Sequence, residues 1–330
     1  MAKFKAFDGK ELNINNFYRN QHGFLVVNGP SLNDVDKSLL TQPGIMTLGV
    51  NNGPAAFRPN LWIMADDNTS FIRSIWLDPR IVKFVPEGKK GKKLFHNDEF
   101  KEMKTSVGDC SSIVYYERNY KFEPEKWLHQ DSLNWGNKTH ICGCGYEHKQ
   151  IKDKDGNWKK PPDKICPKCG DYNRFGHYNI IYLAVGLMFH LGFRTLNIVG
   201  ADFHMDKGHT YAFDQARSRN SIKNNNAQYE EANKRFDALK PHFEKHGYNV
   251  FNCYEDSGLK SFPYKSLEQA VSDATENLPP AVTDKWGVWR CQENTKGLYD
   301  RKANEKQKKK DKRGKGEMTI DEFLRMKGVA

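Results

Sequence analysis

The chain has 330 residues, of which 38% are hydrophobic and 12% aromatic, enough apolar material for a packed core. No run of 18 or more apolar residues is present, and the first ten residues lack the apolar stretch of a secretion signal. The sequence therefore predicts a cytoplasmic protein that does not enter membranes.

The formal net charge of +11 is concentrated in three segments. Residues 301–316 hold nine Lys or Arg against two acidic residues, residues 147–168 hold seven against four, and residues 88–93 add four lysines. Basic segments attached to a near-neutral remainder favour a polyanionic partner such as DNA. Solvated lysine loops produce the same pattern, so both interpretations stay open.

Short apolar runs alternate with helical patterns along most of the chain. Residues 24–28 are expected to form a buried strand, followed by a Gly-Pro-Ser-Leu turn and an amphipathic helix that reaches residue 40. Further strands are expected at 45–50, 61–64, 81–85, 112–116, 195–199 and 249–252, and glycine-stopped helices at 178–191 and 229–246. This alternation predicts an α/β fold with a doubly wound, mostly parallel, Rossmann-like sheet.

Two insertions interrupt this pattern. We expect residues 1–137 and 172–283 to be the two parts of one nucleotide-binding domain, and residues 138–171 to be a zinc-ribbon insertion. Residues 284–330 are expected to be a basic tail, partly disordered, that ends in a short helix.

The zinc prediction depends on four cysteines in two close pairs, Cys142 with Cys144 and Cys166 with Cys169. Cys-Pro-x-Cys-Gly is typical of a zinc knuckle, and the Asp-Gly between the pairs predicts a hairpin turn. Four such ligands predict a closed, structural Zn²⁺ site, with His140 as an alternative ligand because the first pair has Cys-x-Cys spacing. Two roles stay open for this insertion: phosphate contacts through its charged hairpin, or only the tying down of a long loop.

Polar residues follow four of the expected strands, at the edge where open α/β sheets bind ligands. The glycine of the first turn permits close backbone approach, and a following helix offers N–H groups to a phosphate. Turn formation and helix capping are the plainer explanations of the same residues. These strand-end residues are Asn28, Gly29, Pro30, Ser31, Asn51, Asn52, Asp66, Asp67, Asp202 and His204.

The carboxylates allow a second chemistry. Asp66, Asp67 and Asp202 are placed to hold Mg²⁺ against a pyrophosphate, which would suit a phosphotransfer enzyme. Asp66 and Asp67 equally suit the cap of the next helix.

One segment carries a family resemblance. Residues 186–214, GLMFHLGFRTLNIVGADFHMDKGHTYAFD, resemble the bacterial lipo-oligosaccharide sialyltransferases, which have a helix ending in Leu-Gly, a strand ending in Gly-x-Asp-Phe-Tyr and then Tyr-Ala-Phe-Asp. The Asn-Gly-Pro-Ser-Leu turn at residues 28–32 is similar to theirs, and its Gly-Pro-Ser-Leu also occurs in the MptE-like proteins, which are hydroxymethylpterin pyrophosphokinases. The late segment at residues 250–257 is similar to an Asn/Ser loop of this group. The resemblance covers residues 24–270 without the cysteine insertion.

The resemblance implies a GT-A or sialyltransferase-like glycosyltransferase that takes a nucleotide-activated sugar donor. It places Asn28, Gly29 and Ser31 at the phosphate and sugar of the donor, and Asn51 or Asn52 at its base or ribose. Asn252 and Ser257 belong to the late loop of the same donor site.

For catalysis, the resemblance matches Tyr211 with a tyrosine that stabilises the leaving phosphate. His204 stands where the family has a second tyrosine, and a histidine there still donates a hydrogen bond. The family's histidine base has no counterpart, because residues 224–232 hold no histidine. His204, His209 or Glu230 takes that role, or the reaction differs.

Three functions are therefore open. The first is a glycosyltransferase that acts on an acceptor hydroxyl, with DNA carrying a modified base as the acceptor suggested by charge. The second is an MptE-like, Mg²⁺-dependent pyrophosphokinase or other phosphotransfer enzyme. The third is a non-catalytic nucleic-acid-binding module.

Overall fold

The computed structural model of the chain describes residues 1–67, 70–96, 101–137, 140–141, 147–148, 177–206, 210–215 and 219–277. The chain divides into two compact units, Met1–Glu276 and Asn277–Ala330. The fold described below is that of the first unit.

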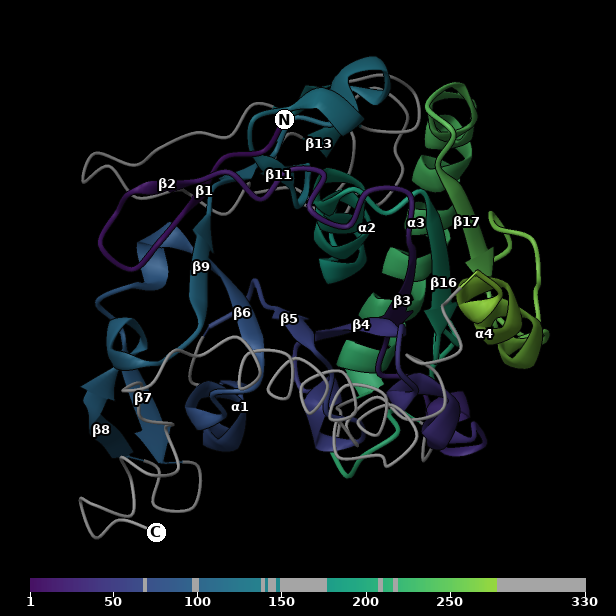
Figure 1. Ribbon diagram of the computed structural model, residues 1–330. Coiled ribbons are helices and arrows are strands. Elements are labelled where there is room, and N and C mark those ends of the chain that lie inside the picture. Colours follow the sequence, from purple (N-terminus) through teal and green to yellow (C-terminus); the bar gives the residue numbers. More distant parts are fainter. Residues whose placement is uncertain are drawn as a thin grey trace, which may run out of the picture. The chain divides into compact units, whose positions relative to one another are not determined.

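Within the described residues, nine strands form one sheet in the order β17-β16-β3-β4-β5-β6-β9-β1-β2 (Figure 1). The strands from β17 to β9 are parallel to one another, whereas β1 and β2 are antiparallel at one edge. This confirms the predicted α/β fold with a mostly parallel sheet. The strands are β1 (Phe4–Lys5), β2 (Glu11–Leu12), β3 (His22–Val26), β4 (Met46–Val50), β5 (Leu61–Ile63), β6 (Val82–Pro86), β9 (Ile113–Tyr116), β16 (Thr195–Val199) and β17 (Asn249–Asn252).

Helices and small two-stranded sheets surround the central sheet. The α-helices are α1 (Arg73–Leu77), α2 (Ile180–Leu191), α3 (Arg219–Lys245) and α4 (Leu267–Thr275). The 3₁₀ helices are η1 (Pro30–Asn33), η2 (Lys37–Thr41), η3 (Gly53–Ala55), η5 (Glu87–Lys89), η6 (Val107–Asp109) and η7 (Pro124–His129). The short paired strands are β7 (Lys93–His96) with β8 (Lys101–Ser106), β10 (Arg118–Asn119) with β11 (Leu133–Asn134), β12 (Gly136–Asn137) with β15 (His177–Tyr178), and β13 (His140–Ile141) with β14 (Glu147–His148).

Both faces of the sheet are covered, because successive side chains of a strand point to opposite faces. In β3, Leu25 belongs to the apolar cluster that includes α2 and α3, whereas Phe24 belongs to the cluster that includes α4 and the 3₁₀ helices η1 and η2. Residues 181–191 of α2 are all buried, which explains why this helix is apolar on every side.

The glycine stops and most strand positions follow the sequence predictions. Gly192 ends α2 with a φ of 105°, and Gly247 follows α3 with a φ of 62°, as a left-handed C-terminal residue requires. Helix α3 begins at Arg219, ten residues before the predicted start at 229.

The single helix predicted between the first two strands is wrong. Two 3₁₀ helices, η1 and η2, occupy that stretch. The side chain of Asp36 accepts a hydrogen bond from Ser38 N–H at 2.9 Å and starts η2 as a separate turn. Short polar residues such as aspartate compete with a continuing helix in this way.

The order of the strands reverses beside β3. From β3, the chain adds β4, β5, β6 and β9 in one direction, and then returns to place β16 and β17 on the other side of β3. Loops leave β3 and β16 in opposite directions at such a reversal, so a crevice opens between them at the carboxyl ends of the strands.

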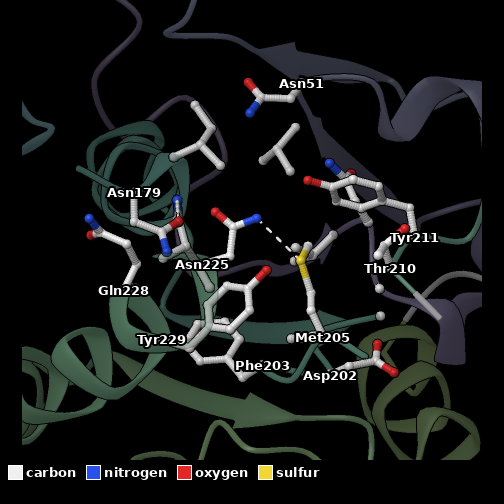
Figure 2. A pocket seen from close by; sticks show the side chains of 18 of the residues that line it. Asn51, Asn179, Asp202, Phe203, Met205, Thr210, Tyr211, Asn225, Gln228 and Tyr229 are labelled. Carbon is white, nitrogen blue, oxygen red and sulfur yellow. Dashed lines mark hydrogen bonds between the residues drawn. The ribbon is translucent and has the colours of Figure 1, made fainter. Parts of the chain in front are cut away.

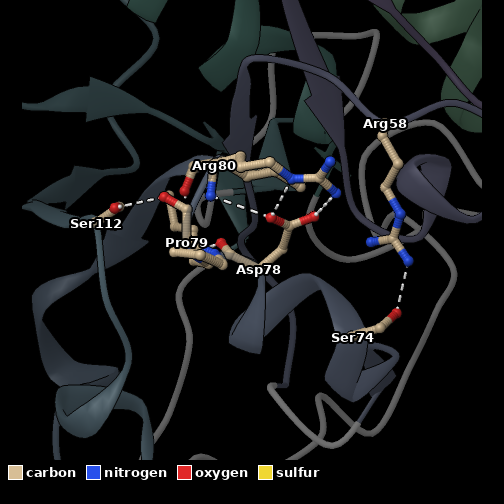
Figure 3. A network of polar contacts seen from close by, with 8 residues as sticks. Arg58, Ser74, Asp78, Pro79, Arg80 and Ser112 are labelled. Atoms are coloured by element: carbon tan, nitrogen blue, oxygen red, sulfur yellow. Dashed lines mark hydrogen bonds and ion pairs between the residues drawn. The ribbon is translucent and has the colours of Figure 1, made fainter.

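A buried lysine connects the loops that precede β6 and β9, at the amino-terminal ends of these strands. Lys83 of β6 is fully buried, and its Nζ donates to three backbone carbonyls, those of Asp78, Ile81 and Ser111, at 2.7, 2.9 and 3.0 Å. Figure 3 shows the neighbouring polar contacts, in which Arg80 holds Asp78 with two hydrogen bonds from its guanidinium. These contacts fix the loop between α1 and β6.

No helix in the described part of the chain is both long and apolar enough to span a bilayer.

Candidate functional site

A cavity of about 400 Å³ lies at the carboxyl ends of β3, β4, β5 and β16, where the strand order reverses (Figure 2). It is lined by the loops after these strands, by the first residues of α2, and by Asn224, Asn225, Gln228 and Tyr229 of α3. Seven of the strand-end and loop residues singled out in the sequence line it: Asn28, Gly29, Asn51, Asp66, Asp202, His204 and Tyr211.

The turn after β3 is held by the loop after β16. Asp202 accepts hydrogen bonds from the backbone N–H of Ser31 at 3.1 Å and from its hydroxyl at 2.7 Å. A Cβ on Gly29 would lie 1.8 Å from Asp202 Oδ2 and 2.6 Å from Gly200 O, so only glycine fits there. In this arrangement, the Asp202 carboxylate accepts the hydrogen bond of the Ser31 N–H, one of the backbone groups that the sequence suggested for binding a phosphate.

Two asparagines on adjacent strands line the cavity with their amides. Asn28 Oδ1 is buried against Gly53: a Cβ added to Gly53 would lie only 2.4 Å from this oxygen. The other end of the amide, Nδ2, is therefore the one that can face the cavity. Asn51 adopts a left-handed conformation with a φ of 46°, and its Nδ2 lies 3.4 Å from Asp66 Oδ2. The Trp62 indole donates to Asn51 O at 2.7 Å and holds this conformation.

The chain beyond β16 forms the next wall. Phe203 has a φ of 53° and stacks on Tyr229 of α3, with ring centroids 4.8 Å apart. This turn places His204 and the buried Met205 in the cavity wall, and His204 Nε2 lies 2.9 Å from Asp206 Oδ2, with both of these side chains exposed. Tyr211 stacks on Phe213 at 5.3 Å, which positions its ring beside Thr210.

The helix side of the cavity was not predicted from the sequence. Because α3 begins early, Asn224, Asn225, Gln228 and Tyr229 lie on it and line the cavity. Asn179 lines it from the N-terminus of α2. The run of three asparagines at 224–226 was the signal available in the sequence, but it precedes the helix predicted at 229–246 and was not expected on a helix.

Trp135 is another lining residue that the sequence did not single out. It lies in the segment between β11 and β12, and the guanidinium carbon of Arg118 lies 4.2 Å from the centroid of its ring. Arg118 also donates to Ala65 O at 2.6 Å, next to Asp66. This contact links the tryptophan to the loop after β5.

Amides and hydroxyls are the main polar groups of the cavity wall. Among the described lining residues, Asp66 and Asp202 are acidic, and none is Lys or Arg. Such a surface can hydrogen-bond a sugar, a nucleobase or a single phosphate. A polyphosphate would usually require cationic partners.

Five of the predicted site residues lie in the loops around the cavity, where they contact other parts of these loops or begin a helix. Asn52 donates to Ser70 O at 2.8 Å, and Asp67 lies 3.7 Å from Lys89 Nζ. Asn252 donates to Tyr254 O at 2.9 Å, and the Ser257 hydroxyl donates to Ala201 O. Pro30 is the first residue of η1. None of the five lines the cavity.

His209 and all four cysteines of the predicted zinc site, Cys142, Cys144, Cys166 and Cys169, lie outside the described residues. Within the described residues, no group of three or more His, Cys, Asp or Glu side chains is arranged to hold a metal ion.

Comparison with protein-family models, with curated proteins and with solved structures finds no match to this chain.

Proposed function

We propose that the chain is a glycosyltransferase that moves a sugar from a nucleotide-activated donor to an acceptor hydroxyl. The observation that carries this proposal is the cavity at the reversal of the strand order, lined by amides, hydroxyls and one exposed histidine. Open α/β sheets bind nucleotides at this position. The resemblance of residues 186–214 to bacterial sialyltransferases points to the same reaction class.

In this proposal, the donor phosphate lies between the loops after β3 and β16. Asn28 Nδ2 and the Tyr211 hydroxyl are neutral donors that line the cavity there. Hydrogen bonds aimed at the departing phosphate stabilise the charge that develops as the glycosidic bond breaks. Asp202 keeps the turn in place through Ser31 and is not required to contact the donor.

His204 is the proposed base. Its imidazole lies at the cavity rim, and Asp206 orients it through Nε2, which leaves Nδ1 to accept the proton of the acceptor hydroxyl. The hydroxyl oxygen then attacks the anomeric carbon while the nucleotide leaves. The exposed position of His204 suits a bulky acceptor, and the basic segments favour DNA or another polyanion as that acceptor.

The Mg²⁺-dependent phosphotransfer alternative has less support. Of the three carboxylates proposed for it, Asp67 does not line the cavity and Asp202 is bound by Ser31. The structural Zn²⁺ in residues 138–171 and the basic tail at 284–330 remain predictions from sequence.

A thermal-shift screen against CMP, UDP, GDP and ATP compounds tests the donor class. A ligand at about one hundred times its Kd raises the free energy of unfolding by about 2.7 kcal/mol. The proposal expects one nucleotide type to stabilise the protein, and turnover that continues in EDTA. Stabilisation by none of them would reject it, and turnover that stops in EDTA would favour phosphotransfer.

Two variants then test the reaction centre. Tyr211→Phe keeps the ring stacked on Phe213 and removes only the hydroxyl, and His204→Ala removes the base. Both should lower turnover, the second by about a hundredfold or more, with little change in donor binding. Tyr264→Phe is the matched control, because Tyr264 is half-exposed and does not line the cavity. Full turnover in both test variants would show that the centre is assigned wrongly.

A further inference from the structure

Two histidines from different elements meet at the surface of the first unit. His129 is the last residue of η7, and His246 directly follows the end of α3. Their Nε2 atoms lie 3.0 Å apart, although the two residues are 117 positions apart in the chain. His129 is exposed and His246 is partly exposed, so an ion in solution can reach the pair.

The orientation of the two rings does not suit a straight hydrogen bond between them. The ring centroids are only 4.4 Å apart, and the ring planes are inclined by 71°. Two imidazoles joined head to head through Nε2 would have more distant centroids, because both nitrogens would lie on the line between the rings. The rings are therefore inclined to the line that joins the Nε2 atoms, and a hydrogen bond between them is bent and weak.

The separation of the nitrogens instead fits two ligands of one metal ion. With metal–nitrogen bonds of about 2.1 Å, two neighbouring ligands of an octahedral or square-planar ion lie about 3.0 Å apart, and two ligands of a tetrahedral ion about 3.4 Å apart. The observed 3.0 Å agrees with the first arrangement. Cu²⁺ and Ni²⁺ prefer ligands in such positions.

Packing holds both imidazoles in place without a metal. The ring of Phe189, on α2, contacts both imidazoles edge to face, with centroid distances of 6.2 Å to His129 and 6.3 Å to His246. The backbone N–H of His246 donates to Phe243 O at 3.1 Å, and the Phe243 ring lies 5.7 Å from that of Trp127 in η7. Ligands that neighbouring side chains hold in position make a precise metal site.

The charges around the pair indicate which kind of ion fits. The pKa of His246 is lowered, first by burial and then by basic neighbours: His129, Lys245, His242 and Arg194. Mg²⁺ and Ca²⁺ bind through oxygen ligands, above all carboxylates, so basic surroundings disfavour them. Neutral imidazole nitrogens suit Zn²⁺, Cu²⁺ and Ni²⁺.

We propose that His129 and His246 together bind one transition-metal ion, Cu²⁺ or Ni²⁺ more tightly than Zn²⁺, with water in the remaining positions. The ion joins η7 to the end of α3. It lies outside the cavity, because Tyr229 lines the cavity and the helix rises by roughly 25 Å between Tyr229 and His246. The proposal therefore goes beyond the transfer reaction and does not depend on it.

Calorimetric titration of the full chain with Ni²⁺, without an affinity tag, tests the site. The cysteines of residues 142–169 can also bind a soft metal, so they are filled with Zn²⁺ before the titration. His129→Gln and His246→Gln should each weaken the binding of one Ni²⁺ by at least about tenfold. Mg²⁺ should bind to none of the three proteins at this place. His22→Gln is the matched control, because His22 is a partly exposed histidine beside Lys265 and Asp273 and should keep the native Ni²⁺ affinity.

Electron paramagnetic resonance of bound Cu²⁺ identifies the ligands directly. The native chain should show hyperfine coupling to two imidazole nitrogens, and each variant should show coupling to one. If His246→Gln fails to fold, His129→Gln decides alone, since His129 is exposed. An absence of Ni²⁺ binding, or affinity and spectra that neither substitution changes, would overturn the proposal and leave the pair as a hydrogen-bonded contact.

Discussion

A buried histidine makes the stability of this fold sensitive to acid. His190 of α2 is 1% exposed, and its Nδ1 accepts the backbone N–H of Ala2 at 3.2 Å. This contact joins the N-terminal segment before β1 to the core helix. Burial, followed by the nearby N-terminal amine, His129 and Arg194, lowers the pKa of His190 to about 3. The imidazole is therefore neutral in the folded protein.

The depressed pKa sets the direction of the effect. The ordinary histidine pKa is 6.5, so below that value the unfolded chain binds a proton that the folded chain excludes. Stability from this group is complete above about pH 6.5 and falls as the pH drops toward 3. Between about pH 7.5 and pH 5, the difference between these two pKa values lowers the free energy of unfolding by about 2 kcal/mol.

Urea unfolding at several pH values measures this loss. His190→Asn is the informative variant, because asparagine Oδ1 can accept the Ala2 N–H but does not titrate. The variant loses ring volume and should be less stable at neutral pH, by roughly 2 kcal/mol. Its free energy of unfolding should nevertheless fall less than that of the native chain between pH 7.5 and 5. Equal pH dependence in the two proteins would refute the reasoning, since all other titrating groups are shared.

Three further substitutions test contacts around the site and the sheet. Gly29→Ala places a methyl group against Asp202 and should cost at least about 2 kcal/mol in urea unfolding, whereas Gly88→Ala, with nothing within 4 Å, should cost little. Lys83→Met leaves three carbonyls without their donor and should lower the free energy of unfolding by about 3 kcal/mol, with no loss for a variant of an exposed lysine. Ser257→Ala removes the hydroxyl that bonds to Ala201 O and should cost about 1 kcal/mol and weaken nucleotide binding in the same thermal-shift screen.

Strand positions were predictable because most of the parallel strands are short apolar runs buried on both faces. β16 at Thr195–Val199 and β17 at Asn249–Asn252 have the predicted bounds. The edge strands β1 and β2 were missed, since two-residue strands leave no periodic signal. The early start of α3 was missed for another reason: residues 222–228 are mostly polar, and Asn224, Asn225 and Gln228 line the cavity, so this part lacks the apolar stripe that marks a helix.

At two strand ends, the sequence predicted a pair of identical site residues, and only one residue of each pair lines the cavity. Asn51 and Asn52 are identical neighbours, yet Asn51 lines the cavity while Asn52 bonds to Ser70 O and Ile72 N–H. Asp66 and Asp67 divide in the same way. Which member of each pair lines the cavity depends on the contacts of the loop that follows the strand. Those contacts are made with residues 18 or more positions away in the sequence, so the local sequence does not show them.

The pairing of Asp202 with Ser31 explains why an acidic residue can stand in a site proposed for a phosphate. Both oxygens of the carboxylate face the N-terminal turn of η1, where they satisfy an N–H and a hydroxyl. A phosphate bound by the same N–H would have to displace Asp202, so in the proposed site the phosphate is held by side chains beyond the turn. Asn28 and Tyr211 are the cavity residues proposed for that contact, and Ala212 N–H donates to Asn28 O at 2.9 Å, which couples their two loops. In this proposal, the Gly-Pro-Ser turn supports the loop that carries Asn28 and is not itself a phosphate ligand.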